Sequence, residues 1–235
     1  MIFKNKKERE IVNWDELPIL PIKGTALFPE TIIPILVGKE GSLELVKEAY
    51  SGDGIIGICA LKNQDAEPIE AQDIYTFGAR AKIVKTVNLP DGNMNVILRG
   101  LSRIQVLEFV TKTPYFKARV IEAAETDLQD DEIQAMEENL KNQAIRAIKL
   151  IPTIPDEISV MISSIDRPGY LADLIASNLN VSVAEKQDIL EALSIKERLQ
   201  KVTVLVNQKI EILELGNKIQ SQVKGEIDKT QREYY

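Results

Sequence analysis

The chain has no histidine among its 235 residues. This absence excludes Ser-His-Asp and Cys-His nucleophilic schemes, histidine general bases and nearly all catalytic zinc sites. The single cysteine, Cys59, lies inside the apolar run 55–61, which indicates a small buried residue in a reducing cytoplasm and not half of a disulfide. The sequence also lacks G-x-x-x-x-G-K-[ST], the phosphate loop of many ATPases. We therefore expect no catalytic residue, no metal site and no cofactor in this chain.

Long hydrophobic runs and aromatic residues are scarce as well. The longest aliphatic stretches, such as 32–37, are too short and too often broken by proline to span a bilayer. Aromatic residues make up 5% of the chain and its net charge is −7, both of which argue against non-specific nucleic-acid binding. The charge is uneven, because 78–120 holds eight Lys or Arg and two acids, whereas 122–138 holds eight acids and no base. Such a switch indicates a change from one structural unit to another.

Extended segments fill the chain up to about residue 122. The prolines at 18, 21, 29 and 34 confine the segments within 17–37 to sheet edges or bulges, because proline cannot donate a ladder hydrogen bond. The run 55–61 is typical of a buried strand, and apolar residues alternate with polar ones from 79 to 98 around a turn at Pro90-Asp91-Gly92. Two further strands are expected at 104–109 and 116–120, and a short helix at 41–50. We predict a mixed, mainly antiparallel β unit.

From Asp127 the apolar period becomes helical. A first helix ends before Pro152, a second spans 156–165, and Asp166 is expected to cap a third, with Pro168 in its first turn. Ser182 with Glu185, and Ser194 with Glu197, have the spacing of a capping box. The last helix would continue without proline to the end of the sequence, roughly 60 Å at 1.5 Å per residue. It shows no stop signal, so we expect further sequence to follow.

Two chemical patterns have ordinary interpretations. Gly52-Asp53-Gly54-Ile55-Ile56-Gly57 matches G-x-G-x-x-G, but a dinucleotide site needs a strand before the glycines and a helix after them. Here a helix precedes and a strand follows, so the glycines indicate a tight turn. The paired acids at 130–131 are expected at the start of a helix and those at 137–138 on its polar face, as solvated surface and not as acid/base machinery.

Several ordered motifs resemble the N-terminal domain of the Lon ATP-dependent protease family. They are Leu17-Pro18-Ile19-Leu20-Pro21-Ile22, Leu27-Phe28-Pro29, Ile33-Pro34-Ile35-Leu36-Val37-Gly38, Gly100-Leu101-Ser102-Arg103, Arg167-Pro168-Gly169-Tyr170-Leu171-Ala172-Asp173-Leu174-Ile175-Ala176, Lys186-Gln187-Asp188-Ile189-Leu190-Glu191, Ile195-Lys196-Glu197-Arg198-Leu199, and, as the most specific match, Lys218-Ile219-Gln220-Ser221 with Lys229-Thr230-Gln231-Arg232-Glu233-Tyr234-Tyr235. The resemblance covers essentially the whole chain. It implies an α+β fold, with a PUA-like β pseudo-barrel at 1–122, a helical subdomain at 123–193 and a long helix at 194–235. That helix would lead toward an ATPase domain that this chain lacks.

The resemblance also implies a function without catalysis. This chain would recognise unfolded or damaged polypeptides in the cytoplasm and present them to an AAA+ motor and a Ser-Lys protease, which lie outside it and use ATP and Mg²⁺. Its partners would be those polypeptides and other subunits of a homohexamer. The candidate substrate contacts are Leu27, Phe28 and Pro29 in an expected loop, and Lys39 and Glu40 in a polar turn. The alternative for Leu27 and Phe28 is an ordinary place in the core, and for Lys39 and Glu40 a solvated turn.

An RNA-binding module is the alternative function. PUA-like folds elsewhere bind RNA, and the strands between Arg80 and Arg119 are basic. The scarcity of aromatic residues for base stacking and the overall acidity argue against this alternative.

Overall fold

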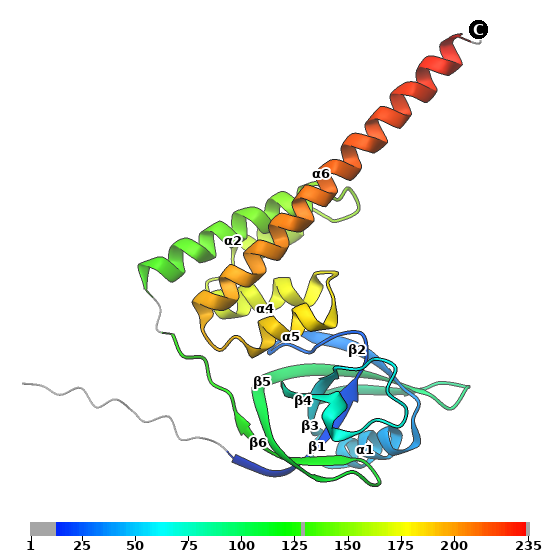
Figure 1. Cartoon of the computed structure of the whole chain (residues 1–235), viewed down its shortest axis with the longest axis vertical. Coiled ribbons are helices and arrows are strands. Elements are labelled where there is room, and N and C mark those ends of the chain that lie inside the picture. The colour runs from blue at the N-terminus through cyan, green and yellow to red at the C-terminus, as the bar shows by residue number, and fades with distance from the viewer. Residues whose placement is uncertain (1–12, 128–129, 234–235) are drawn as a thin grey trace, which may run out of the picture. The chain divides into compact units, whose positions relative to one another are not determined.

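The computed structural model describes residues 13–127 and 130–233 (Figure 1). It divides into two compact units. Within the described residues, the first unit holds 13–124 and 180–191, and the second holds 125–179 and 192–233. The predicted α+β class, with a β pseudo-barrel, helices and a long last helix, is confirmed. The three-part division at residues 122 and 193 stays a prediction.

The first unit is built on one six-stranded sheet in the order β2-β5-β4-β3-β1-β6. Because β5 also pairs with β6, the sheet closes on itself and leaves β2 as an edge strand outside the ring (Figure 1). Neighbours are antiparallel except for β1 and β3, which run parallel. The strands are β1 (Asn13–Ile22), β2 (Ile32–Val37), β3 (Ile55–Leu61), β4 (Ile74–Asn88), β5 (Met94–Thr111) and β6 (Phe116–Glu122).

The strand predictions were right in kind but wrong about the division of β5. Strand β5 is one continuous element, because its pairing shifts register at bulges and so bends without ending, whereas two strands were expected from 94 to 109. Strand β1 lies within the ring, but Pro18 and Pro21 each lie where the strand has a partner on one side only, which agrees with the prediction for these prolines. It pairs with β6 as far as Ile19 and with β3 from Ile19 onward, with a bulge near its start. Pro34 does lie in the edge strand, as predicted.

Helix α1 (Glu40–Ser51) covers part of the sheet. Its buried residues are Leu45 and Val46, whereas Tyr50 in its last turn is exposed. One apolar cluster joins α1 to residues of β1, β3, β4 and β5, and a second gathers the opposite faces of β1 and β3 with β6. The glycines after α1 form a turn that leads into β3, which is the order expected from the sequence.

Helix α5 (Val183–Glu191) and the short helix η1 (Ala71–Asp73) complete the first unit. Buried Arg103 on β5 donates from Nε to the Leu190 carbonyl at 3.0 Å, and Gln187 donates to the Phe77 carbonyl at 3.1 Å. The predicted capping box at Ser182 and Glu185 is confirmed, since each backbone N–H is bonded by the other side chain.

The second unit contains α2 (Asp131–Lys149), α3 (Glu157–Ser163), α4 (Pro168–Asn178) and α6 (Ile195–Glu233). Helix α6 is continuous, and α2 lies alongside its first half (Figure 1). No helix among the described residues is long and apolar enough to cross a membrane.

The starts of α4 and α6 differ from the predicted caps. The residue before α4 is Arg167 and not Asp166, although Pro168 does occupy its first turn. At α6, Ser194 accepts the Glu197 N–H at 3.2 Å, as predicted. Asp127, distant in sequence, accepts the Lys196 N–H at 2.9 Å and the Ser194 hydroxyl at 2.7 Å. These hydrogen bonds lower the pKa of Asp127, so its carboxylate stays ionised and completes the cap.

A buried arginine joins three parts of the second unit. Arg198 of α6 is fully buried, and its Nη1 lies 2.8 Å from a Glu125 carboxylate oxygen and 3.3 Å from each carboxylate oxygen of Asp173. Its Nε donates to the Ala192 carbonyl at 3.2 Å. Gly169 leaves room for this arrangement, because an added Cβ there would lie 2.5 Å from a Glu125 oxygen.

Candidate functional site

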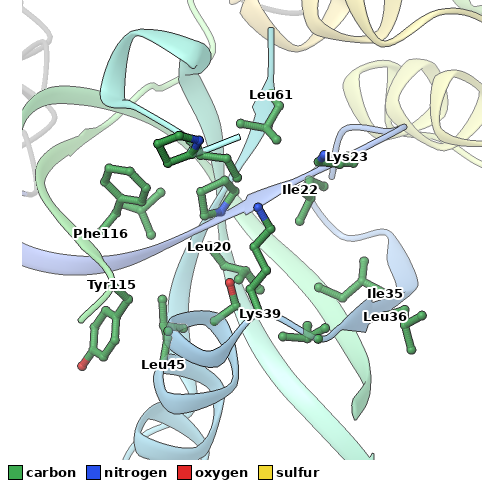
Figure 2. Close-up of a pocket in the computed structure, with 18 of the residues that line it drawn as sticks. Leu20, Ile22, Lys23, Ile35, Leu36, Lys39, Leu45, Leu61, Tyr115 and Phe116 are labelled. Carbon is green, nitrogen blue, oxygen red and sulfur yellow. The ribbon is translucent and has the colours of Figure 1, made fainter. Parts of the chain in front are cut away.

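An open apolar groove of about 590 Å³ crosses the first unit (Figure 2). Its walls come from β1, from β2 with the start of α1, from the segment between β3 and η1, and from the β5–β6 turn. Apolar side chains dominate its lining, among them Leu20, Ile22, Ile35, Leu36, Leu45 and Phe116. A groove of this size and character can take apolar side chains of a ligand.

The wall formed by α1 and the β5–β6 turn is closely packed. Gly41 lies against the backbone of Pro114, where an added Cβ would come within 2.2 Å of the carbonyl oxygen. The next residue, Tyr115, is buried, and its hydroxyl donates to a Glu48 carboxylate oxygen at 2.5 Å. Burial, followed by the hydrogen bond to Glu48, raises the pKa of Tyr115 to about 12. The turn and the helix are therefore held as one wall.

The segment between β3 and η1 forms the opposite wall, and hydrogen bonds at both of its ends fix it. Gln64 accepts the Gly24 N–H at 2.8 Å, which ties the segment to the end of β1. Farther along, Lys112 of the β5–β6 turn lies 2.5 Å from a Glu70 oxygen. Pro68 and Ile69, between these two attachments, line the groove.

Charged side chains stand on the rim of the groove. Lys23, Lys39 and Lys112 line it together with one acid, Glu67. The Lys39 ammonium lies 2.8 and 2.9 Å from the two Glu67 carboxylate oxygens. The hydrogen bond and the charge of Lys39 lower the pKa of Glu67, so the Glu67 carboxylate is ionised at neutral pH.

Strand β2 presents apolar side chains to solvent beside the groove. Ile32 and Leu36 are 62% and 63% exposed, and Pro34 between them is exposed too. The Gly100 N–H donates to the Thr31 carbonyl, which sets the hydrogen-bond pattern of the antiparallel ladder. The backbone N–H and C=O groups of the odd-numbered residues of β2 therefore point toward β5, and those of the even-numbered residues point toward the free edge. Pro34, at the middle outward position, has no N–H to offer. The free edge therefore carries exposed apolar side chains, and its row of backbone N–H donors is interrupted at Pro34.

The structure separates the five residues predicted as substrate contacts. Leu27 and Phe28 are 1% and 0% exposed, so they are core residues here, which is the alternative stated above, and not an accessible loop. Their segment is held by the Thr31 hydroxyl, which donates to the Phe28 carbonyl at 2.8 Å. Pro29 is half-buried, and Lys39 and Glu40 are exposed. Of the five, only Lys39 lines the groove, and contact of any of them with substrate stays a prediction.

Sequence reasoning did not find most of the groove. Glu67 and the 114–116 turn reach it only through the tertiary fold, since they lie far apart in sequence from β2. One signal was available in the unbroken apolar run 32–37. When a strand contains proline and has apolar residues on both of its faces, we expect an edge strand with exposed apolar side chains.

Several of the basic residues on these strands are buried or bonded within the first unit. Arg103 of β5 is buried against α5, Arg119 lies 3.2 Å from Glu108, and Lys82 donates to the Asp53 carbonyl. Nothing in this arrangement favours the RNA-binding alternative. Within residues 13–127 and 130–233, no three acidic or cysteine side chains are grouped to hold a metal ion.

Comparison with known proteins gives a consistent result. The family model described as the ATP-dependent protease La (LON) substrate-binding domain matches residues 16–208. A Lon protease of Dictyoglomus thermophilum is 44% identical over 219 residues, which are 93% of this chain and 28% of that protein. A Lon protease of Anaeromyxobacter dehalogenans is 41% identical over 93% of this chain and 26% of its own length. The chain thus spans about a quarter of the length of these relatives.

Solved structures agree on the fold. The N-terminal domain of a Mycobacterium avium complex Lon protease superposes with a TM-score of 0.68 at 20% identity, over 82% of this chain and 98% of that one. A Lon N-terminal domain protein from Xanthomonas campestris superposes with a TM-score of 0.55 at 17% identity, over 81% and 98% of the two chains. At these identities the likeness shows a shared architecture.

Proposed function

Because this chain belongs to the family of substrate-binding domains of the ATP-dependent protease La (Lon), we propose that it binds unfolded or damaged polypeptides and presents them to the motor and protease of a longer protein. The supporting observation is the open apolar groove of the first unit. A folded protein keeps most of its large apolar side chains inside, whereas an unfolded chain exposes them. A surface groove lined by Ile22, Ile35 and Leu36 therefore favours unfolded chains over folded ones.

The groove suits side-chain recognition better than strand addition. A continuous added strand needs backbone donors and acceptors along the free edge of β2, and Pro34 removes the central donor. Apolar burial does not depend on one side-chain shape and contributes roughly 1.5–3 kcal/mol for each fully buried aliphatic side chain. Two or three such contacts give weak binding that tolerates many sequences, which is what a quality-control substrate site requires.

The test is binding of a chemically unfolded, fluorescently labelled model protein to this chain and to two variants. Leu36→Glu puts a charge on the groove, whereas Leu107→Glu makes the same change on β5 away from it. The two leucines are 63% and 57% exposed, so both variants are expected to fold with similar stability. We expect Leu36→Glu to weaken binding about tenfold or more, and Leu107→Glu to leave it unchanged.

The natively folded form of the same model protein is the ligand control, and it is expected not to bind. Equal binding by Leu36→Glu and Leu107→Glu would remove the groove from the proposed function. Preference for the folded ligand would contradict the function itself.

Helix α6 supports a second part of the proposal, a contribution to assembly. Its first half buries Leu199, Val202, Val206 and Ile210, whereas farther along Ile212, Leu215, Ile219 and Val223 are exposed. These four are spaced by three and four residues, so they share one face of the helix. We propose that this face pairs with the same face of other subunits.

Hydrogen exchange measured over a range of chain concentrations tests this pairing. In the monomer, amides at 212–223 should exchange faster than those at 195–210, because fewer packed side chains cover them. Protection at 212–223 should rise with concentration, and Ile219→Lys should cancel that rise. Equal protection of amides at 195–210 and 212–223 in a monomer would contradict the proposal that the face at 212–223 is uncovered until subunits pair.

A further inference from the structure

The rim of the groove carries an ion pair whose two members stand on different walls. Lys39 follows β2 at the start of α1, and Glu67 lies between β3 and η1. Figure 2 shows the Lys39 side chain extended toward the middle of the groove residues. Its ammonium contacts both Glu67 oxygens, and both residues line the groove. A ligand that enters here meets this pair as well as the apolar lining.

We propose that Lys39 selects, among unfolded segments, those in which an acidic side chain adjoins an apolar one, and that the ligand's carboxylate replaces Glu67 on Lys39. This inference rests on the proposed function and names the class of substrate segment that the groove takes. No bond is made or broken, because one carboxylate exchanges for another on the same ammonium.

Charge complementarity supports this choice. Three lysines and one acid line the groove, although the chain as a whole has a net charge of −7. Lys112 is already paired with Glu70, so once Glu67 is displaced, Lys39 and Lys23 face no other acid of this lining. A ligand carboxylate is therefore attracted to the groove, whereas a ligand lysine or arginine in the same place is repelled.

The exchange is energetically accessible because the ion pair is exposed to solvent. The Lys39 and Glu67 side chains are 46% and 70% exposed. An ion pair as exposed as this contributes little to stability, so its opening is inexpensive. Because Lys39 lowers the pKa of Glu67, the competing carboxylate is ionised at neutral pH. Glu67 therefore acts as an internal competitor that an acidic ligand displaces and a neutral ligand does not.

The experiment uses three unstructured, fluorescein-labelled peptides of leucine, serine and glycine. They differ at one position beside the leucines, which is glutamate, glutamine or lysine. Affinities are measured by fluorescence anisotropy for the unmodified chain and for Lys39→Met, which keeps much of the aliphatic length and removes the charge. A third protein, Glu67→Gln, removes the competitor and keeps its shape.

We expect the glutamate peptide to bind about threefold to fivefold more tightly than the glutamine peptide, and the lysine peptide to bind most weakly. Lys39→Met should abolish the difference between glutamate and glutamine, and Glu67→Gln should enlarge it. Added salt should reduce it, since the contact is exposed. Glu108→Gln, which removes the acid of a similarly exposed pair with Arg119 outside the groove, is the matched control and should change nothing.

Equal binding of the three peptides, or a glutamate preference that survives in Lys39→Met, would overturn the inference. If all three bind equally and Leu36→Glu still weakens them, the groove keeps its proposed function and only the acid selectivity fails. If neither the peptides nor an unfolded protein bind, the proposed function itself is refuted.

Discussion

Replacing Arg198 by methionine should destabilise the second unit strongly. The guanidinium is fully buried and contacts Asp173, whose side chain is only 3% exposed, and Glu125, whose side chain is 41% exposed. Methionine fills much of the same volume, so the change removes a charge without opening a large cavity. Asp173 then remains as a buried carboxylate that has lost this cation.

The size of the effect follows from the burial of the two partners. Removing one member of a buried ion pair costs about 3–5 kcal/mol, because the remaining charge is desolvated without its counterion. The Glu125 contact adds less, since that carboxylate is partly solvated and can turn to water. We therefore expect the free energy of opening of the second unit to fall by about 3–5 kcal/mol, a large part of the stability of a typical domain.

Native-state hydrogen exchange in α4 and α6 is the appropriate assay, because it reports on the second unit separately from the first. The double variant Arg198→Met/Asp173→Asn is the control, since it removes both charges. It should be less destabilised than the sum of the two single variants, with a coupling of about 1–3 kcal/mol. A loss below about 1 kcal/mol in Arg198→Met, or strict additivity in the double variant, would refute this account of the buried pair.

Two further predictions concern the groove wall, and the last helix supplies a control for the first. Gly41→Ala places a methyl group 2.2 Å from the Pro114 carbonyl and should lower the thermal midpoint and weaken binding of unfolded protein, at a cost of about 1–3 kcal/mol. The control Gly216→Ala meets no atom within 4 Å in α6 and should stabilise that helix by up to about 1 kcal/mol, so equal effects of the two changes would contradict the packing argument. Tyr115 has a folded pKa of about 12, above its unfolded value, so its contribution to stability is complete below pH 10 and is lost as the pH rises toward 12. In Tyr115→Phe, which cannot ionise or bond to Glu48, urea midpoints should fall less steeply over this range, and an unchanged slope would speak against the raised pKa.

Much of the fold could be predicted from local patterns. The predicted strand at 55–61 has the same first and last residues as β3, and the predicted turn around Gly92 connects β4 and β5 in a hairpin. Both depend on alternation and turn chemistry, which short stretches of sequence contain. The interior place of β1 could not be predicted in this way. Its prolines argue for an edge, but the strand exchanges one partner for another at Ile19, and that pairing is set by the closed sheet.

The candidate site was only partly predictable, for a related reason. Leu27 and Phe28 are large apolar residues in the loop before β2, which is why they were predicted as contacts. Both are buried in the core of the first unit. Lys39, which does line the groove, was predicted as a contact because it lies in a polar turn after a strand. Its partner Glu67 is an ordinary acidic residue in sequence, and only the fold brings it within 2.8 Å. The motif residues Asp173 and Arg198 likewise show their role only when the helices bring them together.

The exposure of the groove and of its ion pair fits a site that must release what it binds. Affinity differences between related ligands arise mostly in the dissociation rate, and deep enclosure of a ligand slows dissociation. Here the groove is open, its most exposed apolar contact, Leu36, is 63% exposed, and its charged contact is 46–70% exposed. Each contact is therefore weak, and a chain can leave by breaking them one at a time. The proposed transfer of a polypeptide to a motor requires this property, since any affinity of the site for the polypeptide has to be overcome at every transfer.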